Sequence, residues 1–418
     1  MMTQAFYTGL SGLRSSSTGI DVVSDNLANV STVGYRSYDV EFSSIFEETL
    51  NTSSLNSGQN SIGIGTYANA ISMNETAGEL IITEASTDLA ISGEGWFGVQ
   101  GTSGEMFTRA GNFTFNADSA LVTPDGNYVL GTMANNIENG ILTNVVDSLD
   151  LGDINTQEKL EFPNTLYSPA DPTSIANFYG NLGISDETRK ISASVIDSQS
   201  NKNELKLTFT KSEVQNELGT RWDVVAVTSS LDGESVYDTQ EGVVEFDETG
   251  GLVSSSLKTI DNNGTEVEIN LGTEMNGVIS TDSMAISGSS SSDGTIGGEL
   301  LGYTINMNSE VIATFSNGVQ SSVGKVAVYH FQNDQGLERI SGSLFQETSN
   351  SGEALFYQDE NGKNILGSTV VHNKLENSNY NIAAGLTDLI ILQRSFDANS
   401  KSITTAHEMM QKALQMDA

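Results

Sequence analysis

The chain of 418 residues contains no cysteine, and this absence excludes several kinds of chemistry. Without thiols there can be no disulfide, no thiolate nucleophile and no thiolate metal site. Histidine is almost as rare, because only His330, His372 and His407 occur, and their separation fits no metal-ligand spacing. A protein of this composition outside the cell has to be held together by burial or by assembly.

Basic residues are also scarce, with 18 Lys and Arg against 54 Asp and Glu and a net charge of −36. Phosphate backbones are bound by clustered Lys and Arg, so nucleic acid is not an expected partner. An anionic membrane surface is disfavoured by the same repulsion. The charge is uneven: residues 1–30 carry −1 and residues 376–418 carry −2. The middle of the chain therefore carries almost all of the charge and is expected to face water.

Long apolar runs are missing, because no stretch approaches the roughly 18 uncharged apolar residues that a membrane span needs. The first residues show neither a basic region nor a continuous apolar core of the kind found in secretory signals. We therefore expect no membrane insertion. The protein is expected to be either cytosolic or exported by a route without a cleaved signal peptide.

The last 40 or so residues carry a heptad pattern that is typical of a helix facing another helix. The spacing alternates between four and three without a break. The stripe consists of Ile382, Leu386, Leu389, Gln393, Phe396, Ser400, Ile403, His407, Met410 and Leu414.

The first thirty residues carry a matching stripe of Phe6, Leu10, Leu13, Ser17, Ile20, Ser24 and Leu27. Three glycines interrupt this helix, and each costs about 1 kcal/mol relative to alanine. A single helix of this length is marginal in water. One interpretation is that each helix packs on its own domain; the other, which we favour, is that residues 1–30 fold only when packed and that both stripes join copies of the chain.

Between the helices the apolar period falls to two, which predicts a mainly β protein. Strands are expected at 89–91, 96–100, 112–116, 127–130 and 325–331, with a turn at 123–126. Clean alternation at 205–210 and 266–271 predicts half-buried antiparallel strands. Residues 50–74 and 286–294 are rich in small polar residues and are predicted to be linkers.

These patterns predict nested, discontinuous domains. Residues 1–30 with 376–418 form a helical domain, 31–77 a linker or extended arm, 78–148 with 295–375 a β domain, and 149–294 an inserted outer β domain.

We find no pattern that indicates an active site, a metal site or a cofactor site. His330 alternates with Val326 and Val328, as expected of a partly buried strand residue. The acidic sequences at 261–264 and 359–362 fail the EF-hand spacing, and turns between strands explain them better. The sequence therefore predicts a protein that is not an enzyme.

Four blocks, in order, resemble the shared blocks of the bacterial flagellar rod and hook proteins. They are residues 28–35, 93–97, 107–126 and 393–401. The residues that carry the resemblance are Asn29, Gly34, Tyr35, Gly95, Trp96, Phe97, Arg109, Gly111, Gln393, Arg394 and Asn399. Residues 6–10, with Phe6 and Leu10, are similar to the export-gate motif of the family. The match covers residues 1–131 and 376–418, and the size of the chain favours a hook protein over the shorter rod proteins.

This resemblance implies a tubular homopolymer in which the paired terminal helices form a coiled coil around a central channel. It further implies export through the flagellar type III apparatus and an extracellular location in the hook. Expected partners are the distal rod, hook cap and hook–filament junction proteins. The tube would act as a flexible coupling that carries motor torque from rod to filament.

Two alternatives stay open at this point. A distal rod protein would share every block but form a straight, rigid polymer. A secreted β-rich hydrolase or adhesin with helical ends would be a stable monomer with ordered termini.

Overall fold

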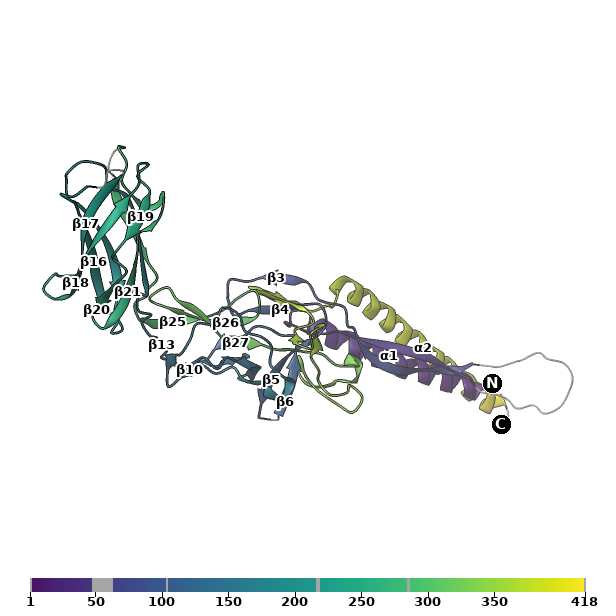
Figure 1. The fold of residues 1–418 in the computed structure, drawn as a ribbon. Helices are drawn as coiled ribbons and strands as arrows, with labels where there is room; N and C mark the ends of the chain where they lie inside the picture. The colour runs from purple at the N-terminus through teal and green to yellow at the C-terminus, as the bar shows by residue number, and fades with distance from the viewer. Residues whose placement is uncertain (1, 47–62, 103, 216–218, 284–285, 417–418) are drawn as a thin grey trace.

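The computed structural model describes residues 2–46, 63–102, 104–215, 219–283 and 286–416. The molecule is elongated, with both helices at one end, a first β unit in the middle and a second β unit at the other end (Figure 1). Helix α1 (Met2–Ala28) and helix α2 (Ile382–Met416) lie side by side, as the stripes predicted. The predicted fold class, mainly β with paired terminal helices, is therefore confirmed.

Next to the helices lies a two-stranded antiparallel ribbon of β1 (Tyr38–Phe46) and β2 (Gly63–Met73). The ribbon packs along α1, and Ser15 Oγ donates a hydrogen bond of 3.0 Å to the Thr66 carbonyl oxygen. The part of the expected linker at 31–77 that the structure describes is therefore mostly a paired ribbon. Weak strand propensity at 63–73 is offset by antiparallel pairing with β1, which is interrupted by two register shifts and which a single sequence segment does not reveal. Residues 47–62 lie outside the described residues.

The middle unit, which we call the inner β unit, is built around a branched sheet of fifteen short strands. These are β5 (Trp96–Gly101), β6 (Gly104–Thr108), β7 (Thr114–Phe115), β8 (Leu121–Val122), β9 (Tyr128–Met133), β10 (Ile137–Glu138), β11 (Ile141–Leu142), β12 (Glu158–Lys159), β13 (Tyr167–Ser168), β25 (Gly298–Ile305), β26 (Glu310–Phe315), β27 (Gln320–Val326), β28 (Val328–Tyr329), β29 (Glu338–Ser341) and β30 (Leu344–Gln346).

Three further strand pairs complete this unit. They are β3 (Leu80–Ile82) with β34 (Lys374–Glu376), β4 (Leu89–Ser92) with β33 (Thr369–His372), and β31 (Tyr357–Gln358) with β32 (Asn364–Ile365). Short 3-10 turns occur at Ile154–Thr156 and Asp334–Gly336. The strands expected at 89–91 and 96–100 are confirmed, and those expected at 112–116 and 127–130 are present as β7 and β9.

The far unit, which we call the outer sandwich, packs two sheets face to face. One sheet has the order β15 (Arg189–Ile196), β16 (Lys202–Lys211), β17 (Thr220–Ser230), β18 (Val236–Phe246) and β19 (Leu252–Ser255). The other contains β14 (Ile175–Asn181), β20 (Thr259–Asn262), β21 (Thr265–Asn270), β22 (Gly272–Thr273), β23 (Asn276–Ile279) and β24 (Ile286–Ser292). The alternation at 205–210 is confirmed, because Leu205, Leu207 and Phe209 are fully buried between the sheets.

Each β unit has its own hydrophobic core. The inner core runs in sequence up to Leu166 and resumes at Ile305, and the outer core runs from Ala176 to Val278. Leu160 and Phe162 belong to the inner core. The chain therefore passes from the inner core to the outer core between Leu166 and Ala176, and not near residue 148, where the composition suggested a domain boundary.

A buried acid explains why residues 148–151 stay with the inner unit. Glu310 Oε1 accepts hydrogen bonds from the Leu149 amide at 3.0 Å and from Ser148 Oγ at 3.1 Å. Lys325 Nζ lies 3.4 Å from the same oxygen and donates to the Leu149 carbonyl at 2.8 Å. These long-range contacts have no local sequence signal.

The linker predicted at 286–294 is wrong for its first seven residues. Residues 286–292 form β24, which pairs antiparallel with β14. Its serines bond across the sandwich, since Ser290 Oγ donates to the Ser192 carbonyl and Ser292 Oγ donates to the Ser194 carbonyl, each at 2.7 Å. A run of serines indicates flexibility only where such acceptors are absent. The division of the chain into four domains remains a proposal.

Candidate assembly surface

The two terminal helices pack antiparallel through small residues. A Cβ atom on Gly12 would lie 2.7 Å from Asn399 Nδ2, and one on Gly19 would lie 2.9 Å from Leu392 Cδ2. Ser16 Oγ, between these glycines, donates to Ser395 Oγ at 3.2 Å. The glycines that make α1 a weak helix on its own are therefore the residues that let α2 approach closely.

The large apolar residues predicted for the N-terminal stripe lie beside this contact. Phe6, Leu10, Leu13, Ile20 and Leu27 are only half-buried, whereas Gly9, Gly12, Ser16 and Gly19 are buried. Their packing against further copies of the chain stays a prediction. The contact within one chain uses the small-residue stripe, which a search for large apolar side chains does not detect.

On α2 the predicted stripe divides into two parts. Leu389, Phe396, Ile403 and Met410 are half-buried. Ile382 and Leu386 remain 49 % and 45 % exposed, and Ile390, one turn further, is 53 % exposed. The side chain of Leu414 lies outside the described residues. We call Ile382, Leu386 and Ile390, which are spaced four residues apart, the outer row of α2.

Because α2 approaches closely at Gly12, a Gly12→Ala substitution is expected to raise the helicity of a peptide but to lower the yield of polymer. Gly12→Ala is expected to raise the helicity of the isolated N-terminal peptide, because alanine is favoured over glycine by about 1 kcal/mol in a helix. In the intact protein the added methyl meets Asn399, so pairing with α2 and the yield of polymer are expected to fall. Circular dichroism and sedimentation measure the two effects.

Thr18→Ala is the matched control, because Thr18 lies off both the buried stripe and the predicted heptad stripe. It is expected to raise peptide helicity without lowering polymer yield. Polymer at the native yield from the Gly12→Ala protein would contradict the close contact.

Where the helices meet the inner β unit, three charged side chains form a buried cluster. Glu376 Oε1 lies 2.9 Å from Arg36 Nη1, and Glu376 Oε2 lies 3.3 Å from Arg109 Nη1. The side chains of all three residues are at most 5 % exposed. Arg36 also donates to the Thr76 carbonyl, and Arg109 Nη2 donates to the Gly93 carbonyl at 2.6 Å. We call these three residues the junction triad.

Burial dominates the electrostatics of this junction. It lowers the pKa of Arg109 to about 10, with the charge of Arg36 acting in the same direction and that of Glu376 opposing it. Burial likewise lowers the pKa of Arg36 from its ordinary value. Two cations share one carboxylate, so the carboxylate is essential to keep both guanidinium groups in place.

The residues of the first sequence block lie at the junction or at the end of α1 beside it. Gly34 has a φ of +67°, and its amide donates to the Glu376 carbonyl oxygen at 2.8 Å. Tyr35 is buried, and its hydroxyl donates to Asp25 Oδ2 or Asn26 Oδ1, each at 3.1 Å. Burial raises the pKa of Tyr35 to about 12. Asn29 Nδ2 donates to the Asp25 carbonyl at 2.9 Å and so helps to end α1.

The remaining block residues are placed in two groups. Trp96 and Phe97 are buried on β5, after Gly95 with its φ of +113°, and a Cβ on Gly111 would lie 1.8 Å from the Leu89 carbonyl oxygen. Packing therefore restricts which residues can occupy these positions of the sequence blocks. In the C-terminal block, Asn399 faces Gly12, whereas Gln393 and Arg394 are exposed.

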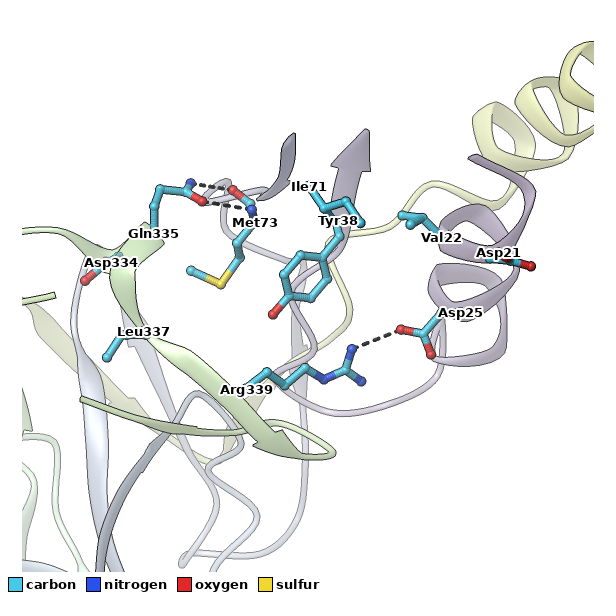
Figure 2. A pocket seen from close by; sticks show the side chains of 10 residues that line it. All are labelled: Asp21, Val22, Asp25, Tyr38, Ile71, Met73, Asp334, Gln335, Leu337 and Arg339. Carbon is cyan, nitrogen blue, oxygen red and sulfur yellow. Dashed lines mark hydrogen bonds and ion pairs between the residues drawn. The ribbon is translucent and has the colours of Figure 1, made fainter. Parts of the chain in front are cut away.

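A second contact joins α1 to the inner unit beside a cavity of about 460 Å³ (Figure 2). Arg339 Nη1, from β29, lies 2.9 Å from Asp25 Oδ2, and its guanidinium lies over the rings of Tyr35 and Tyr38. On the opposite side of the cavity, Gln335 exchanges hydrogen bonds with the backbone amide and carbonyl of Met73. The helical end is thus tied to the inner unit at several points.

Sequence reasoning missed both Glu376 and Arg339. Glu376 is one of 54 acids, and no local pattern distinguishes it. The arginines were a better guide to the junction than the acids. Basic residues are few in this chain, and two buried arginines need a carboxylate as a partner.

Two of the three histidines make short contacts with groups of the chain itself. His330 is buried on the inner unit, with Nε2 2.7 Å from the Leu366 carbonyl oxygen, and His407 Nε2 lies 3.0 Å from Gln411 Nε2. Among the described residues, no cluster of three or more His, Asp or Glu side chains could hold a metal ion. Within the same residues, neither helix combines the length and apolar character that a membrane crossing requires.

Three family models match the chain. A model described as flagella basal body rod protein matches residues 6–36, one described as flagellar hook protein FlgE/F/G D1 domain matches residues 90–161, and one described as flagellar basal body rod FlgEFG protein C-terminal matches residues 372–416. Residues 162–371, which include the outer sandwich, lie outside these three matches.

Curated relatives match along nearly the whole chain. The flagellar hook protein FlgE of Borreliella burgdorferi is 27 % identical, and the match covers 99 % of this chain and 100 % of that one. The FlgE of Brucella melitensis is 29 % identical with 96 % of each chain covered. The FlgE of Escherichia coli is 26 % identical, with 97 % of this chain and 98 % of that one covered.

Among solved structures, the flagellar hook protein FlgE2 of Helicobacter pylori shares the fold. The TM-score is 0.52 at 17 % sequence identity, and the match covers 71 % of this chain and all of that one.

Proposed function

We infer that this chain, which belongs to the flagellar hook protein family, is a structural subunit of a bacterial flagellar hook. It is not an enzyme, because the family is a structural one. The distal rod alternative is not favoured, since the relatives that match from end to end, the middle of the chain included, are hook proteins. The chain assembles with copies of itself, and its location is the hook, outside the cell.

The observation that carries this function is the apolar surface left over after the two helices have paired. The outer row of α2 is about half exposed along one side of the helix, and Phe6, Leu10 and Leu13 are only half-buried on α1. Removing such side chains from water provides about 25 cal/mol per Å², so repeated contacts between copies stabilise a polymer. We propose that these stripes pack between neighbouring copies and that the paired helices form the inner wall of a tube.

We further propose that the two halves of the subunit have different mechanical roles. The helical end is tied to the inner β unit by the junction triad and by Arg339, which suits it to carry torque. Among the described residues, the chain passes between the inner unit and the outer sandwich through residues 169–174 and 293–297, which belong to neither hydrophobic core. This connector, rather than the ribbon of β1 and β2, is the place at which we expect the subunit to bend.

The export route and the specific partners are also proposals. Phe6 and Leu10 would serve as an export-gate motif for the type III apparatus, with no cleaved signal peptide. Distal rod, hook cap and hook–filament junction proteins would adjoin the polymer. These proposals rest on membership of the family.

Complementation tests the function directly. The gene is placed in a flagellated bacterium that lacks its own hook gene but retains the rod, and cell envelopes are imaged by electron microscopy. Curved hooks beyond the outer surface that bind antibody to this chain are the expected result. Rods that end without a hook, while the chain is exported and stable in the medium, would overturn the assignment.

A further inference from the structure

The connector between the two β units is a pair of antiparallel segments with little buried surface. Asp171 and Thr295 exchange two backbone hydrogen bonds of 2.9 Å across it. Most of its residues are exposed or half-buried, and Thr173 is the one side chain of 169–174 that is buried. Since no apolar core fixes the angle between the units, that angle depends on individual hydrogen bonds.

One peptide group of the connector is held from both sides. The carbonyl oxygen of Ile296 accepts a hydrogen bond of 2.8 Å from Asn317 Nδ2, which belongs to the inner unit. The amide of Gly297 donates a hydrogen bond of 2.8 Å to Ser200 Oγ, which belongs to the outer sandwich. The carbonyl and the amide are the two ends of the single peptide plane between residues 296 and 297.

Both side chains that hold this plane are fixed by their own turns. Asp197 is fully buried, and its Oδ1 accepts the amides of Gln199 at 3.0 Å and Asn201 at 2.8 Å. This turn places Ser200 at a φ of +67°. On the other side, Asn317 Oδ1 accepts the Val319 amide at 3.0 Å.

Additional groups hold Asp197 in place. Its Oδ2 accepts hydrogen bonds from Asn263 Nδ2 at 2.8 Å and Asn201 Nδ2 at 3.1 Å. The turn that carries Ser200 is therefore anchored in the base of the outer sandwich, and it moves with that sandwich as one body.

Gly297 lies close to the side chain of Tyr167 on β13. A Cβ there would lie 2.0 Å from Tyr167 Oη, so a larger residue would require the tyrosine ring to move. The peptide plane thus lies against the inner unit on one side while Ser200 reaches it from the outer sandwich.

We propose that Ser200 and Asn317 are positioning residues that form a latch on the 296–297 peptide, and that this latch sets the angle and the stiffness of the joint between the β units. Rotation of the peptide plane breaks both bonds together, because its carbonyl and amide turn as one rigid group. Both bonds lie near solvent, so water replaces the lost partners when the latch opens. The consequence for a bending polymer rests on the proposed hook function; the latch itself does not.

Distance measurements on the free subunit test the latch. Because the chain has no cysteine, Asp125→Cys in the inner unit and Glu248→Cys at the far end of the outer sandwich can carry two spin labels cleanly. The unaltered latch is expected to give one narrow distance distribution by pulsed electron paramagnetic resonance. Ser200→Gly and Asn317→Ala are each expected to broaden it, and the double variant no further than the broader single one.

Ser200→Gly separates the latch from general stability. Glycine adopts a positive φ without strain, so the turn folds as before while the hydroxyl is lost. In a Trp96→Phe background, the urea midpoint of the outer sandwich, followed by fluorescence of the buried Trp222, is expected to stay unchanged or to rise. Ser198→Ala, an exposed serine in the same turn, is the matched control and is expected to keep the narrow distribution.

A broad distribution in the unaltered protein, or a narrow one in both single variants, would overturn the latch. Equal broadening by Ser198→Ala would do the same. These outcomes are independent of assembly, because the subunit is measured free. If the distances behave as expected but the chain builds no hook, the latch is supported and the proposed function is wrong. If the chain builds hooks but the Ser200→Gly and Asn317→Ala variants keep the narrow distribution, the proposed function is supported and the latch is wrong.

Discussion

Replacing Glu376 with alanine is expected to destabilise the inner half of the subunit by about 3–5 kcal/mol. Arg36 and Arg109 would lose the one carboxylate that contacts both, leaving Asp334 as a more distant negative charge, and the Gly78 amide would lose the carboxylate that it donates to at 2.8 Å. Two buried guanidinium groups without a carboxylate must draw in water or move outward. Either response separates the helical end from the inner β unit.

The measurement is urea unfolding at pH 7 in a Trp222→Phe background, in which Trp96 is the remaining tryptophan. Trp96 lies next to the triad, with the Arg109 guanidinium 5.7 Å from its ring centre. The transition reported by Trp96 should therefore shift.

Glu79→Ala is the matched control, because Glu79 is an exposed acid close in sequence to the junction. It is expected to change the unfolding free energy by no more than about 0.5 kcal/mol. If Glu376→Ala shifted the transition no more than Glu79→Ala does, the triad would be a surface contact and the rigid junction would be wrong.

Replacing Ile390 with aspartate is expected to abolish polymerisation while leaving the subunit folded. Ile390 is 53 % exposed in the single chain, so a carboxylate there stays solvated. In a polymer that buries the outer row of α2, the same carboxylate would lose water without gaining a partner. A cost of about 3 kcal/mol raises the critical concentration by more than about a hundred-fold, since each 1.4 kcal/mol is a factor of ten.

Light scattering during seeded growth, with circular dichroism of the subunit, measures both halves of this prediction. Ile390→Leu keeps the side chain apolar and of equal volume, and is expected to polymerise near the native concentration. Normal growth of the Ile390→Asp protein would place the contacts between copies on another face, and the outer row of α2 would need a different explanation.

The sequence predicted what depends on local pattern. Alternation at 205–210 and 266–271 gave half-buried strands, and the heptad spacing gave two helices that pair. The stripe used for pairing within the chain was missed because a search for large apolar residues overlooks Gly12 and Gly19. Those glycines matter through the space they leave, and the space is visible only once Asn399 and Leu392 are beside them.

Features that depend on distant contacts could not be predicted. Leu160 and Phe162 look no different from residues of the outer sandwich until the inner core closes around them. The serines of 286–292 become a strand because β14 and β15 supply acceptors more than ninety positions away. Glu376, Ser200 and Asn317 act through single hydrogen bonds or ion pairs, and a single sequence does not reveal which of many polar residues will meet.

The antiparallel arrangement of α1 and α2 has a consequence for the order of events during synthesis and delivery. Helix α1 comes first along the chain, and the surface that its glycines fit is supplied by the last residues, from Ile382 onward. A chain that travels N-terminus first therefore cannot close its helical end in transit. The helical end therefore closes only once residues 382–416 are present, and a copy that lacks them leaves the glycine face of α1 without its partner.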